Sequence, residues 1–314
     1  MESNDQSHPV KTTRELYHDH VLSSYGRFDL EIVKGAGARV WDETGREYLD
    51  FGAGIAVCSL GHCHPEVTAA VTRQAATLVH CSNLYYTRPQ AELAADLSRL
   101  LGLGGRFFFC NSGAEANEGL IKLARRFGNA TGGRTRILTF AGSFHGRTMA
   151  GISATGQDKV KTGFAPLLEG FTHLPYGSLD AVASALEPDV CAILLEPVQG
   201  EGGIHPASAD FLRGLRQLAD ENKLLLLYDE VQCGLGRTGD WCAWRTIAGY
   251  EAEPDAASWA KGIANGHPLG AFWVSDRTRP GCEGPLHGLL GPGSHGTTYG
   301  GNPVCCAAAA AVLE

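Results

Sequence analysis

The stretch Lys223-Leu-Leu-Leu-Leu-Tyr228 is an unbroken apolar run of strand length, and Asp229-Glu-Val-Gln232 follows it directly. A second such run, Cys191-Ala-Ile-Leu-Leu195, lies earlier in the chain, and an amphipathic helical pattern over residues 209–222 separates the two. Strands that are apolar along their whole length are covered on both faces, as in parallel sheets with helices on either side. These three segments therefore predict an α/β fold with a mostly parallel sheet.

The same alternation extends over most of the chain. It predicts further strands at 106–110, 136–140, 257–260 and 271–274, and further helices at 66–79, 90–101, 114–127, 179–186 and 304–314. We expect residues 1–30 to form an exposed lead-in with a short helix, and residues 31–51 to form short strands around a turn.

Two units are expected, an N-terminal segment over residues 1–75 and a large ligand-binding domain over residues 76–314. The alanine-rich helical pattern at the end of the sequence reaches Glu314 without a cap or stop signal. Such a helix needs a partner to pack against, so we expect the sequence to be part of a longer chain.

Composition is that of an ordinary globular protein, with 44% hydrophobic and 19% charged residues. The formal net charge of −8 argues against bulk binding to nucleic acid or to an anionic membrane. No apolar run approaches the roughly 18 residues of a membrane helix, and the first residues lack the apolar core of a secretory signal. The 10 cysteines are scattered and form no CxxC pair, which favours reduced thiols in a cytoplasmic protein over disulfides or a zinc site.

Ligands bind outside the carboxyl ends of parallel strands, so polar residues that follow predicted strands are the candidate site residues. Ser112, Gly113 and Ala114 follow the strand at 106–110 and open a helix. Free N–H groups and the positive end of the helix dipole suit a phosphate there. The alternative is a plain N-cap at Ser112.

A second candidate loop, Ala141-Gly-Ser-Phe-His-Gly-Arg147, follows the strand at 136–140. Phe144 can stack on a planar ligand, and Arg147 can hold a carboxylate through a bidentate fork. The alternative is a surface loop with a solvated arginine. Glu201 lies in a third glycine-rich loop, Glu196-Pro-Val-Gln-Gly-Glu-Gly-Gly203, which follows the strand at 191–195.

Asp229 and Lys261 follow two further strands. A carboxylate beside four leucines is partly desolvated, which is unfavourable unless a cation faces it. A helix-capping role for Asp229 fits less well, because the segment 233–239 is rich in glycine. Lys261 lies between an apolar strand and a glycine-rich turn. In a low-dielectric site a lysine has a lowered pKa and can form a Schiff base, whereas the default for a lysine is a solvated surface position.

Other ligand motifs are absent from the sequence. There is no GxGxxG fingerprint, no GxxxxGK[ST] loop and no HExxH pair. His62-Cys-His64, with Cys58 nearby, precedes Pro65 and fits a turn better than a metal site, so no metal is predicted.

Six ordered motifs resemble those of the class III, fold-type I, pyridoxal-phosphate (PLP) aminotransferases, from about residue 20 to the last residue. They are Asn111-Ser-Gly-Ala-Glu-Ala-Asn117, Ser143-Phe-His-Gly-Arg-Thr148, Glu196-Pro-Val-Gln-Gly-Glu-Gly-Gly203, Asp229-Glu-Val-Gln232, Ala260-Lys-Gly262 and His295-Gly-Thr-Thr-Tyr-Gly-Gly-Asn-Pro303. Within the family, four stretches most resemble the enzymes that act on acetylornithine: Asp50-Phe-Gly-Ala-Gly-Ile-Ala-Val57, Leu60-Gly-His-Cys-His-Pro65, Ser82-Asn-Leu-Tyr85 and Phe109-Cys-Asn-Ser-Gly-Ala-Glu-Ala-Asn117.

The resemblance implies a role for each matching residue. Lys261 would form the Schiff base with PLP and then move the substrate proton. Asp229 would keep the pyridine nitrogen protonated, and Phe144 would stack on the ring. The remaining cofactor contacts would come from Ser112, Gly113, Ala114, Glu230, Val231 and Gln232, and from Thr298 of a neighbouring subunit. Arg147, Thr297 and Glu201 would bind substrate.

The resemblance also implies an activity and a partner. The expected reaction transfers the terminal amino group of N2-acetylornithine to 2-oxoglutarate, giving N-acetylglutamate 5-semialdehyde and glutamate in arginine biosynthesis, in a homodimer whose active sites are shared. Ornithine, succinylornithine or 4-aminobutyrate are alternative amines. The family's second substrate-binding arginine lies in a C-terminal small domain that this sequence does not contain, so a PLP-binding paralogue without turnover is a further alternative. An aminomutase is disfavoured by the presence of both Arg147 and Glu201.

Overall fold

The computed structural model describes residues 11–314. Its main body is a seven-stranded sheet with the strand order β4-β12-β11-β10-β7-β5-β6. The strands are β4 (Gly105–Cys110), β5 (Arg136–Phe140), β6 (Phe171–Leu174), β7 (Val190–Leu195), β10 (Leu225–Asp229), β11 (Ala256–Trp259) and β12 (Gly270–Ser275). All neighbouring pairs are parallel except the two that involve β12, which runs antiparallel to both β4 and β11. The predicted mostly parallel sheet is confirmed.

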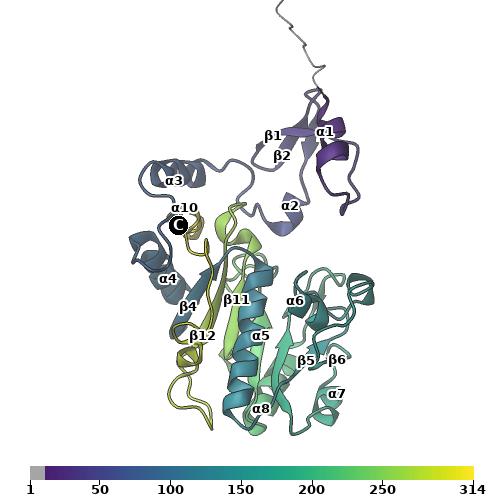
Figure 1. Ribbon diagram of the computed structural model, residues 1–314, viewed down its shortest axis with the longest axis vertical. Coiled ribbons are helices and arrows are strands. Elements are labelled where there is room, and N and C mark those ends of the chain that lie inside the picture. Colours follow the sequence, from purple (N-terminus) through teal and green to yellow (C-terminus); the bar gives the residue numbers. More distant parts are fainter. Residues whose placement is uncertain (1–10) are drawn as a thin grey trace, which may run out of the picture.

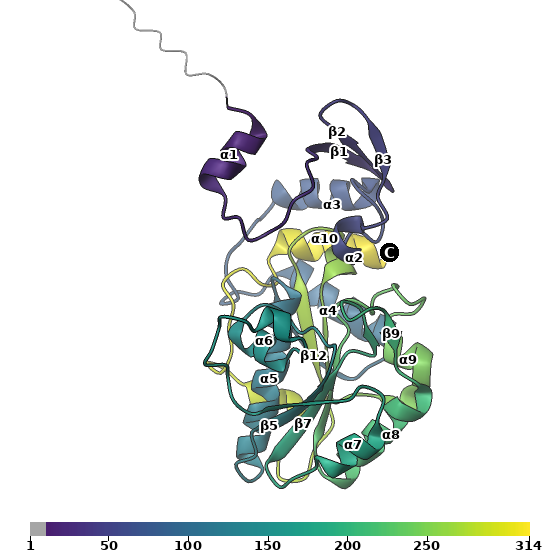
Figure 2. The ribbon, with the colours of Figure 1, turned by 90° about the vertical axis from the view of Figure 1, so that its right-hand side faces the viewer.

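Helices cover both faces of this sheet (Figures 1 and 2). The helices of the main body are α3 (Pro65–Ala75), α4 (Arg88–Leu101), α5 (Gly113–Ala130), α6 (Met149–Ala154), α7 (Leu179–Ser184), α8 (Ala209–Glu221), α9 (Ala243–Ala248) and α10 (Pro303–Leu313). Short 3-10 helices span Asp158–Val160, Tyr250–Ala252, Lys261–Ala264 and Leu286–Leu290, and a small ribbon pairs β8 (Val198–Gln199) with β9 (His205–Pro206).

Strand β10 explains why the leucine run is unbroken. Leu225 and Leu227 belong to the core beneath α5, whereas Leu226 and Tyr228 belong to the core on the α8 side. Successive side chains of a strand point to opposite faces, so a strand that is covered twice needs apolar residues at every position. The same geometry brings Asp229, at the end of this strand, to the carboxyl edge of the sheet.

The N-terminal part forms a separate layer at one end of the molecule (Figure 1). It contains α1 (Thr13–His20), the antiparallel strands β1 (Ile32–Ala36), β2 (Arg39–Asp42) and β3 (Glu47–Leu49), and the short turn α2 (Ala53–Ala56). Asp42 holds the turn between β2 and β3, because its carboxylate accepts hydrogen bonds from Thr44 and from the backbone of Arg46. Residues 1–10 of the predicted lead-in lie outside the described residues.

Several elements differ from the sequence-based expectation. The strand β6 and the helices α6 and α9 were not predicted, and the helix expected over 66–79 ends at Ala75. Helix α3 packs on α10, so the two expected units contact each other through these helices. In the described part of the chain, no helix is both long enough and apolar enough to cross a bilayer.

Candidate active site

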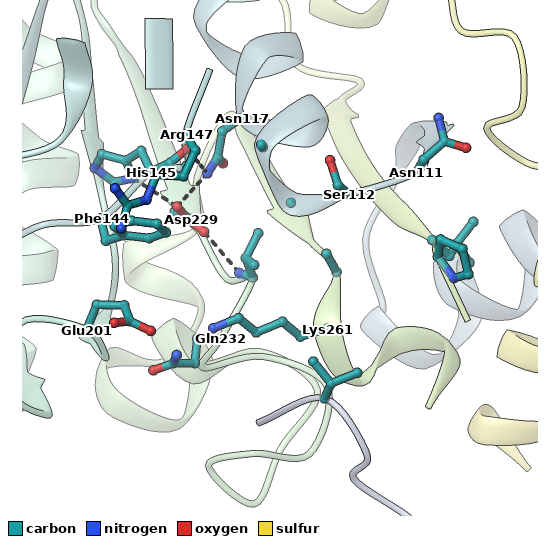
Figure 3. A pocket seen from close by; sticks show the side chains of 18 of the residues that line it. Asn111, Ser112, Asn117, Phe144, His145, Arg147, Glu201, Asp229, Gln232 and Lys261 are labelled. Atoms are coloured by element: carbon teal, nitrogen blue, oxygen red, sulfur yellow. Dashed lines mark hydrogen bonds and ion pairs between the residues drawn. The ribbon is translucent and has the colours of Figure 1, made fainter. Parts of the chain in front are cut away.

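A cavity of about 390 Å³ opens at the carboxyl edge of the sheet. Most of the residues that the sequence singles out line it: Ser112, Gly113, Ala114, Phe144, Arg147, Glu201, Asp229, Val231, Gln232 and Lys261. They come from segments far apart in the sequence, and the sheet brings them together because its parallel strands end at one edge (Figure 3).

The start of α5 supplies backbone N–H groups to this cavity. Ser112 is the N-cap residue, and its hydroxyl and carbonyl oxygens accept hydrogen bonds from the N–H groups of Glu115 and Ala116. Within residues 11–314, no protein acceptor takes the N–H groups of Gly113 and Ala114. These donors are therefore free for an anion, and the positive end of the helix dipole favours one.

Gly113 allows α5 to begin close to the segment that follows β10. A Cβ at this position would lie 2.6 Å from Cγ1 of Val231 and 3.4 Å from Cβ of Ala260. Any other residue would push the first turn of the helix away from Val231 and Ala260. The close approach joins the free N–H groups to the part of the cavity that holds Asp229 and Lys261.

Asp229 is buried, and its carboxylate accepts three hydrogen bonds. Oδ2 lies 2.7 Å from Nδ2 of Asn117 and 2.8 Å from Nδ1 of His145, while Oδ1 accepts the N–H of Val231 at 3.0 Å. A buried carboxylate with this many donors is held in one orientation (Figure 3).

Phe144 and Arg147 lie together on the loop after β5, with the guanidinium carbon 5.6 Å from the centre of the ring. The loop is anchored by Glu196, whose Oε1 accepts the N–H of Phe144 at 2.9 Å and whose Oε2 accepts the N–H of Gly200 at 3.2 Å. Burial raises the pKa of Glu196, and the negative charge of Asp229 raises it further. Glu196 thus ties the aromatic loop to the loop that carries Glu201.

Lys261 points into the cavity, toward Gln232 and Glu201 (Figure 3). Burial lowers the pKa of its amine, while the carboxylates of Glu201 and Asp229 act in the opposite direction. Its backbone adopts φ = +47°, a left-handed conformation that is unfavourable for a residue with a Cβ. A lowered pKa together with local strain in a cleft is typical of a functional lysine.

Three of the predicted site residues lie elsewhere. Glu230 is buried away from the cavity, because its carboxylate accepts the N–H groups of Ala243 and Trp244 at the start of α9, each at 3.0 Å. Its predicted contact with the cofactor is not borne out by this placement. Thr297 and Thr298 line a neighbouring cavity of about 420 Å³ beside Asn111, so a contact between Thr298 and a cofactor in another subunit stays a prediction.

Three buried side chains of the site had no assigned role in the sequence analysis. Asn117, His145 and Glu196 all lie within the quoted motifs and line the cavity. Asn117 was detectable in principle, because it lies four residues after Gly113 and so on the same face of the helix. His145 and Glu196 carry no such signal, since only the folded loops bring them next to Asp229.

The structure contains no candidate metal centre in the part of the chain it describes. Among residues 11–314, no three His, Cys, Asp or Glu side chains gather closely enough to hold an ion.

The family profile and the most similar relatives reported below all point to the same protein family. The profile of the class-III aminotransferases matches residues 22–314. The acetylornithine aminotransferase of Myxococcus xanthus is 51% identical over 300 residues, which cover 94% of this chain and 71% of that protein. The acetylornithine aminotransferase of Methanocaldococcus jannaschii is 46% identical over 302 residues, covering 96% of this chain and 73% of that protein.

Solved structures agree with this result. The ornithine aminotransferase of Toxoplasma gondii superposes with a TM-score of 0.87 at 32% identity, covering 97% of this chain and 71% of that one. The N-acetylornithine aminotransferase of Stenotrophomonas maltophilia superposes with a TM-score of 0.74 at 35% identity, covering 95% of this chain and 70% of that one. A second structure of the T. gondii enzyme contains PLP at partial occupancy in its active site. On the match of residues 22–314 and the 51% identity to the M. xanthus protein, this chain belongs to the class-III aminotransferase family.

Proposed function

We propose that this protein is a PLP-dependent aminotransferase that transfers the terminal amino group of N2-acetylornithine to 2-oxoglutarate. The products would be N-acetylglutamate 5-semialdehyde and glutamate, as in arginine biosynthesis. One observation carries the proposal: Lys261, Asp229 and the free N–H groups of α5 line a single cavity.

The residues of the cavity fit the parts of PLP. The N–H groups of Gly113 and Ala114 have no protein acceptor in the described chain and suit its phosphate. Phe144 offers a flat face for its ring, and the buried carboxylate of Asp229 suits a protonated ring nitrogen. Lys261 supplies the amine that an aldehyde requires.

When bound, PLP supplies an aldehyde that captures amines and a ring that withdraws electrons from the adjacent carbon. The chain contributes the groups that position and move protons. Because burial lowers the pKa of Lys261, a larger share of its amine is neutral and able to accept a proton at Nζ. Asp229 can accept a further donor at Oδ1, since Oδ2 already accepts hydrogen bonds from Asn117 and His145, whereas Oδ1 accepts only the N–H of Val231.

Arg147 is the group best placed to bind the substrate carboxylate. It lies beside Phe144, and its planar guanidinium can bind a carboxylate with two hydrogen bonds. Glu201 lines the same cavity and carries the opposite charge. It can pair with the guanidinium of Arg147 in competition with a substrate carboxylate, or it can face the amino end of a substrate. The two charges together fit a substrate that carries both an amine and a carboxylate.

The choice of acetylornithine is supported by the relatives that bear this name in M. xanthus and M. jannaschii. The high structural similarity to the ornithine aminotransferase of T. gondii supports ornithine as the second candidate. Succinylornithine and 4-aminobutyrate remain further alternatives within the same reaction class.

Product analysis on the full-length gene product tests the proposal. Each of the four amines is supplied with 2-oxoglutarate and PLP, and the formation of glutamate is followed together with the aldehyde product. We expect turnover with acetylornithine to exceed that with the other three amines, and to vanish in Lys261→Ala. Preference for ornithine would replace the first candidate by the second. Glutamate formation by Lys261→Ala at the wild-type rate would refute the proposed chemistry.

The assembly and the location of the protein belong to the same proposal. A homodimer is supported by large apolar side chains that are almost fully exposed in this chain, namely Phe28, Phe51, Leu84 and Tyr86. We further propose that residues 76–314 form the PLP-binding domain. A cytoplasmic location stays a prediction.

A further inference from the structure

The N-terminal part of the chain reaches the cavity through one short segment. Residues 57–62, here called the wall segment, directly follow α2, and Val57 at its start lines the cavity. Among residues 11–314, every other residue that lines the cavity belongs to the main body. The position of the wall segment therefore determines the shape of one side of the cavity.

Asn265 binds the backbone of the wall segment at two adjacent residues. Its Oδ1 accepts the N–H of Leu60 at 2.9 Å, and its Nδ2 donates to the carbonyl oxygen of Gly61 at 2.9 Å. An amide side chain satisfies an N–H and a carbonyl together only in this orientation. Asn265 is 9% exposed, so little water competes for the two hydrogen bonds. They join segments that lie 205 positions apart in the sequence.

Asn265 belongs to the same turn as Lys261. It ends the 3-10 helix Lys261–Ala264, and its backbone adopts a left-handed conformation with φ = +46°. Asparagine tolerates this conformation better than most residues, but glycine adopts it without strain from a Cβ. The backbone alone therefore does not explain an asparagine at this position, whereas the two hydrogen bonds of its side chain do.

The wall segment also packs directly on this turn. A Cβ at Gly262 would lie 2.6 Å from Oγ of Ser59, so the residue after Lys261 has no room for a side chain. Nη2 of the exposed Arg237 lies 3.3 Å from the same hydroxyl oxygen and can donate to it. The wall segment thus rests on the backbone of the turn that carries Lys261.

We propose that Asn265 is a positioning residue that holds the wall segment on the turn of Lys261 and so keeps that side of the cavity in place for the amine substrate. The inference rests on the proposed function, because it concerns the amine that reacts at Lys261. A chain whose wall segment detaches keeps all of its reacting groups. It binds the amine only in the fraction of molecules in which the wall segment is in place, so its apparent affinity falls by that fraction.

The first test reads the two hydrogen bonds directly and requires no catalysis. Asn265→Gly keeps the left-handed backbone and removes both bonds. Lys223→Gly is the matched control, because Lys223 has φ = +54° but is exposed and does not line the cavity. Hydrogen exchange is followed by mass spectrometry in the peptide 57–63 of the full-length protein without an amine. We expect the N–H of Leu60 to exchange at least about tenfold faster in Asn265→Gly, and at the wild-type rate in Lys223→Gly.

The second test uses kinetics to separate positioning from a merely structural role. The substrate is the amine with the highest turnover in the product analysis. We expect its KM to rise about threefold or more in Asn265→Gly, since only part of the enzyme has the wall segment in place. The value of kcat should stay within about twofold of wild type, because the reacting groups are unchanged once the amine is bound. The affinity for PLP should also stay at the wild-type value, since none of the proposed PLP contacts lies in the wall segment.

Asn265→Asp is the conservative variant. Its carboxylate keeps an acceptor for the N–H of Leu60 but loses the donor to Gly61, so its exchange rate and its KM should lie between those of wild type and Asn265→Gly. If Asn265→Gly does not fold, Asn265→Asp decides alone. Values above wild type would then support the inference, and wild-type values would refute it.

The outcomes distinguish this inference from the proposed function. Wild-type exchange in Asn265→Gly would show that Asn265 does not hold the wall segment. Faster exchange with an unchanged KM, or a fall in kcat without a rise in KM, would overturn its role in binding the amine. A wild-type chain that transaminates none of the four amines would refute the proposed function, while the exchange of Leu60 would still decide whether Asn265 holds the wall segment.

Discussion

Asp229 and Ser258 lie opposite each other on the neighbouring parallel strands β10 and β11, and both form hydrogen bonds with Asn117 of α5. The carboxylate therefore extends from a strand and accepts a hydrogen bond from a helix residue that the next strand also holds, in addition to the one from His145 of the loop after β5. The strand β11 continues directly into Lys261, so the same strand pair that positions the acid also positions the amine. The distance between the two groups is determined by the register of the sheet.

Lys261→Ala is expected to abolish transamination. Loss of the amine removes both the attachment point for the cofactor and the group that moves the proton, so we expect kcat to fall by at least about 10³-fold. The measurement is the rate of glutamate formation, together with the absorbance that bound PLP acquires from its link to the lysine. Lys159→Ala serves as the control, because Lys159 is exposed and does not line the cavity, and this variant should behave as wild type.

Gly113→Ala is expected to weaken cofactor binding. The added methyl group would lie 2.6 Å from the side chain of Val231, so the first turn of α5 would have to shift away from the cavity. Overpacking of this size typically costs about 1–3 kcal/mol. We expect PLP to bind at least tenfold more weakly, since a tenfold loss of affinity corresponds to about 1.4 kcal/mol. The affinity is measured by fluorescence quenching.

Gly288→Ala is the control for that experiment, because a Cβ at residue 288 would meet no atom within 4 Å. Equal affinities for PLP in the two alanine variants would contradict the close approach between α5 and Val231.

Glu230→Gln is expected to change how stability depends on pH. Burial raises the pKa of Glu230 to about 7, from an ordinary value of 4.5. Between these values the folded chain binds a proton that the unfolded chain has released, so this group lowers the free energy of unfolding as pH rises through the window. The free energy of unfolding falls by about 3 kcal/mol at most across this window. Glu230→Gln should not show this decrease, because glutamine does not ionise.

Urea denaturation of the PLP-free protein at about pH 4 and about pH 8 measures this effect, since those values bracket the unfolded-state and folded-state pKa values. The difference in unfolding free energy between the two pH values should be smaller in Glu230→Gln than in wild type. Glu221→Gln, at an exposed position on α8, should leave the difference unchanged. An unchanged difference in Glu230→Gln would show that this carboxyl does not titrate in the window.

Mixing two inactive variants tests whether the active site is shared between subunits. Thr298→Asp would repel a phosphate bound in the neighbouring subunit, and Lys261→Ala would inactivate its own subunit. In a random one-to-one mixture about half of the dimers contain both variants, and each of these has one site free of both changes, so about a quarter of the wild-type activity should return. No recovery in a mixture that has exchanged subunits would contradict the predicted role of Thr298.

Sequence patterns predicted the sheet and most of the site because the signals are local. The leucine run of β10 and the apolar run of β7 mark buried strands, and the polar residues that follow them mark the edge where ligands bind. Asp229 and Lys261 were recognisable as unusual because a charged group directly follows each apolar strand. No knowledge of the fold was needed for that inference.

The contacts of the buried polar residues could not be predicted in the same way. His145 is separated from Asp229 by 84 positions and Asn117 by 112, and only tertiary packing brings them together. Glu230 shows the opposite case. It adjoins Asp229 in the sequence, yet successive residues leave a strand in different directions, and its carboxylate binds the start of α9 instead. The strand β6 was missed because its four residues, Phe-Thr-His-Leu, include two polar ones.

The antiparallel strand β12 has a consequence for how this fold could be altered. It lies between β4, which leads to the turn proposed to bind phosphate, and β11, which leads to Lys261. The strands β4 and β11 are therefore separated by two strand spacings, about 10 Å. Gly270 begins β12 opposite Cys110, where a Cβ would lie 2.3 Å from the carbonyl oxygen of Ser112. The strand β12 therefore sets the distance between the start of α5 and Lys261. A change in the residues of β12 would alter that distance without replacing any residue that lines the cavity.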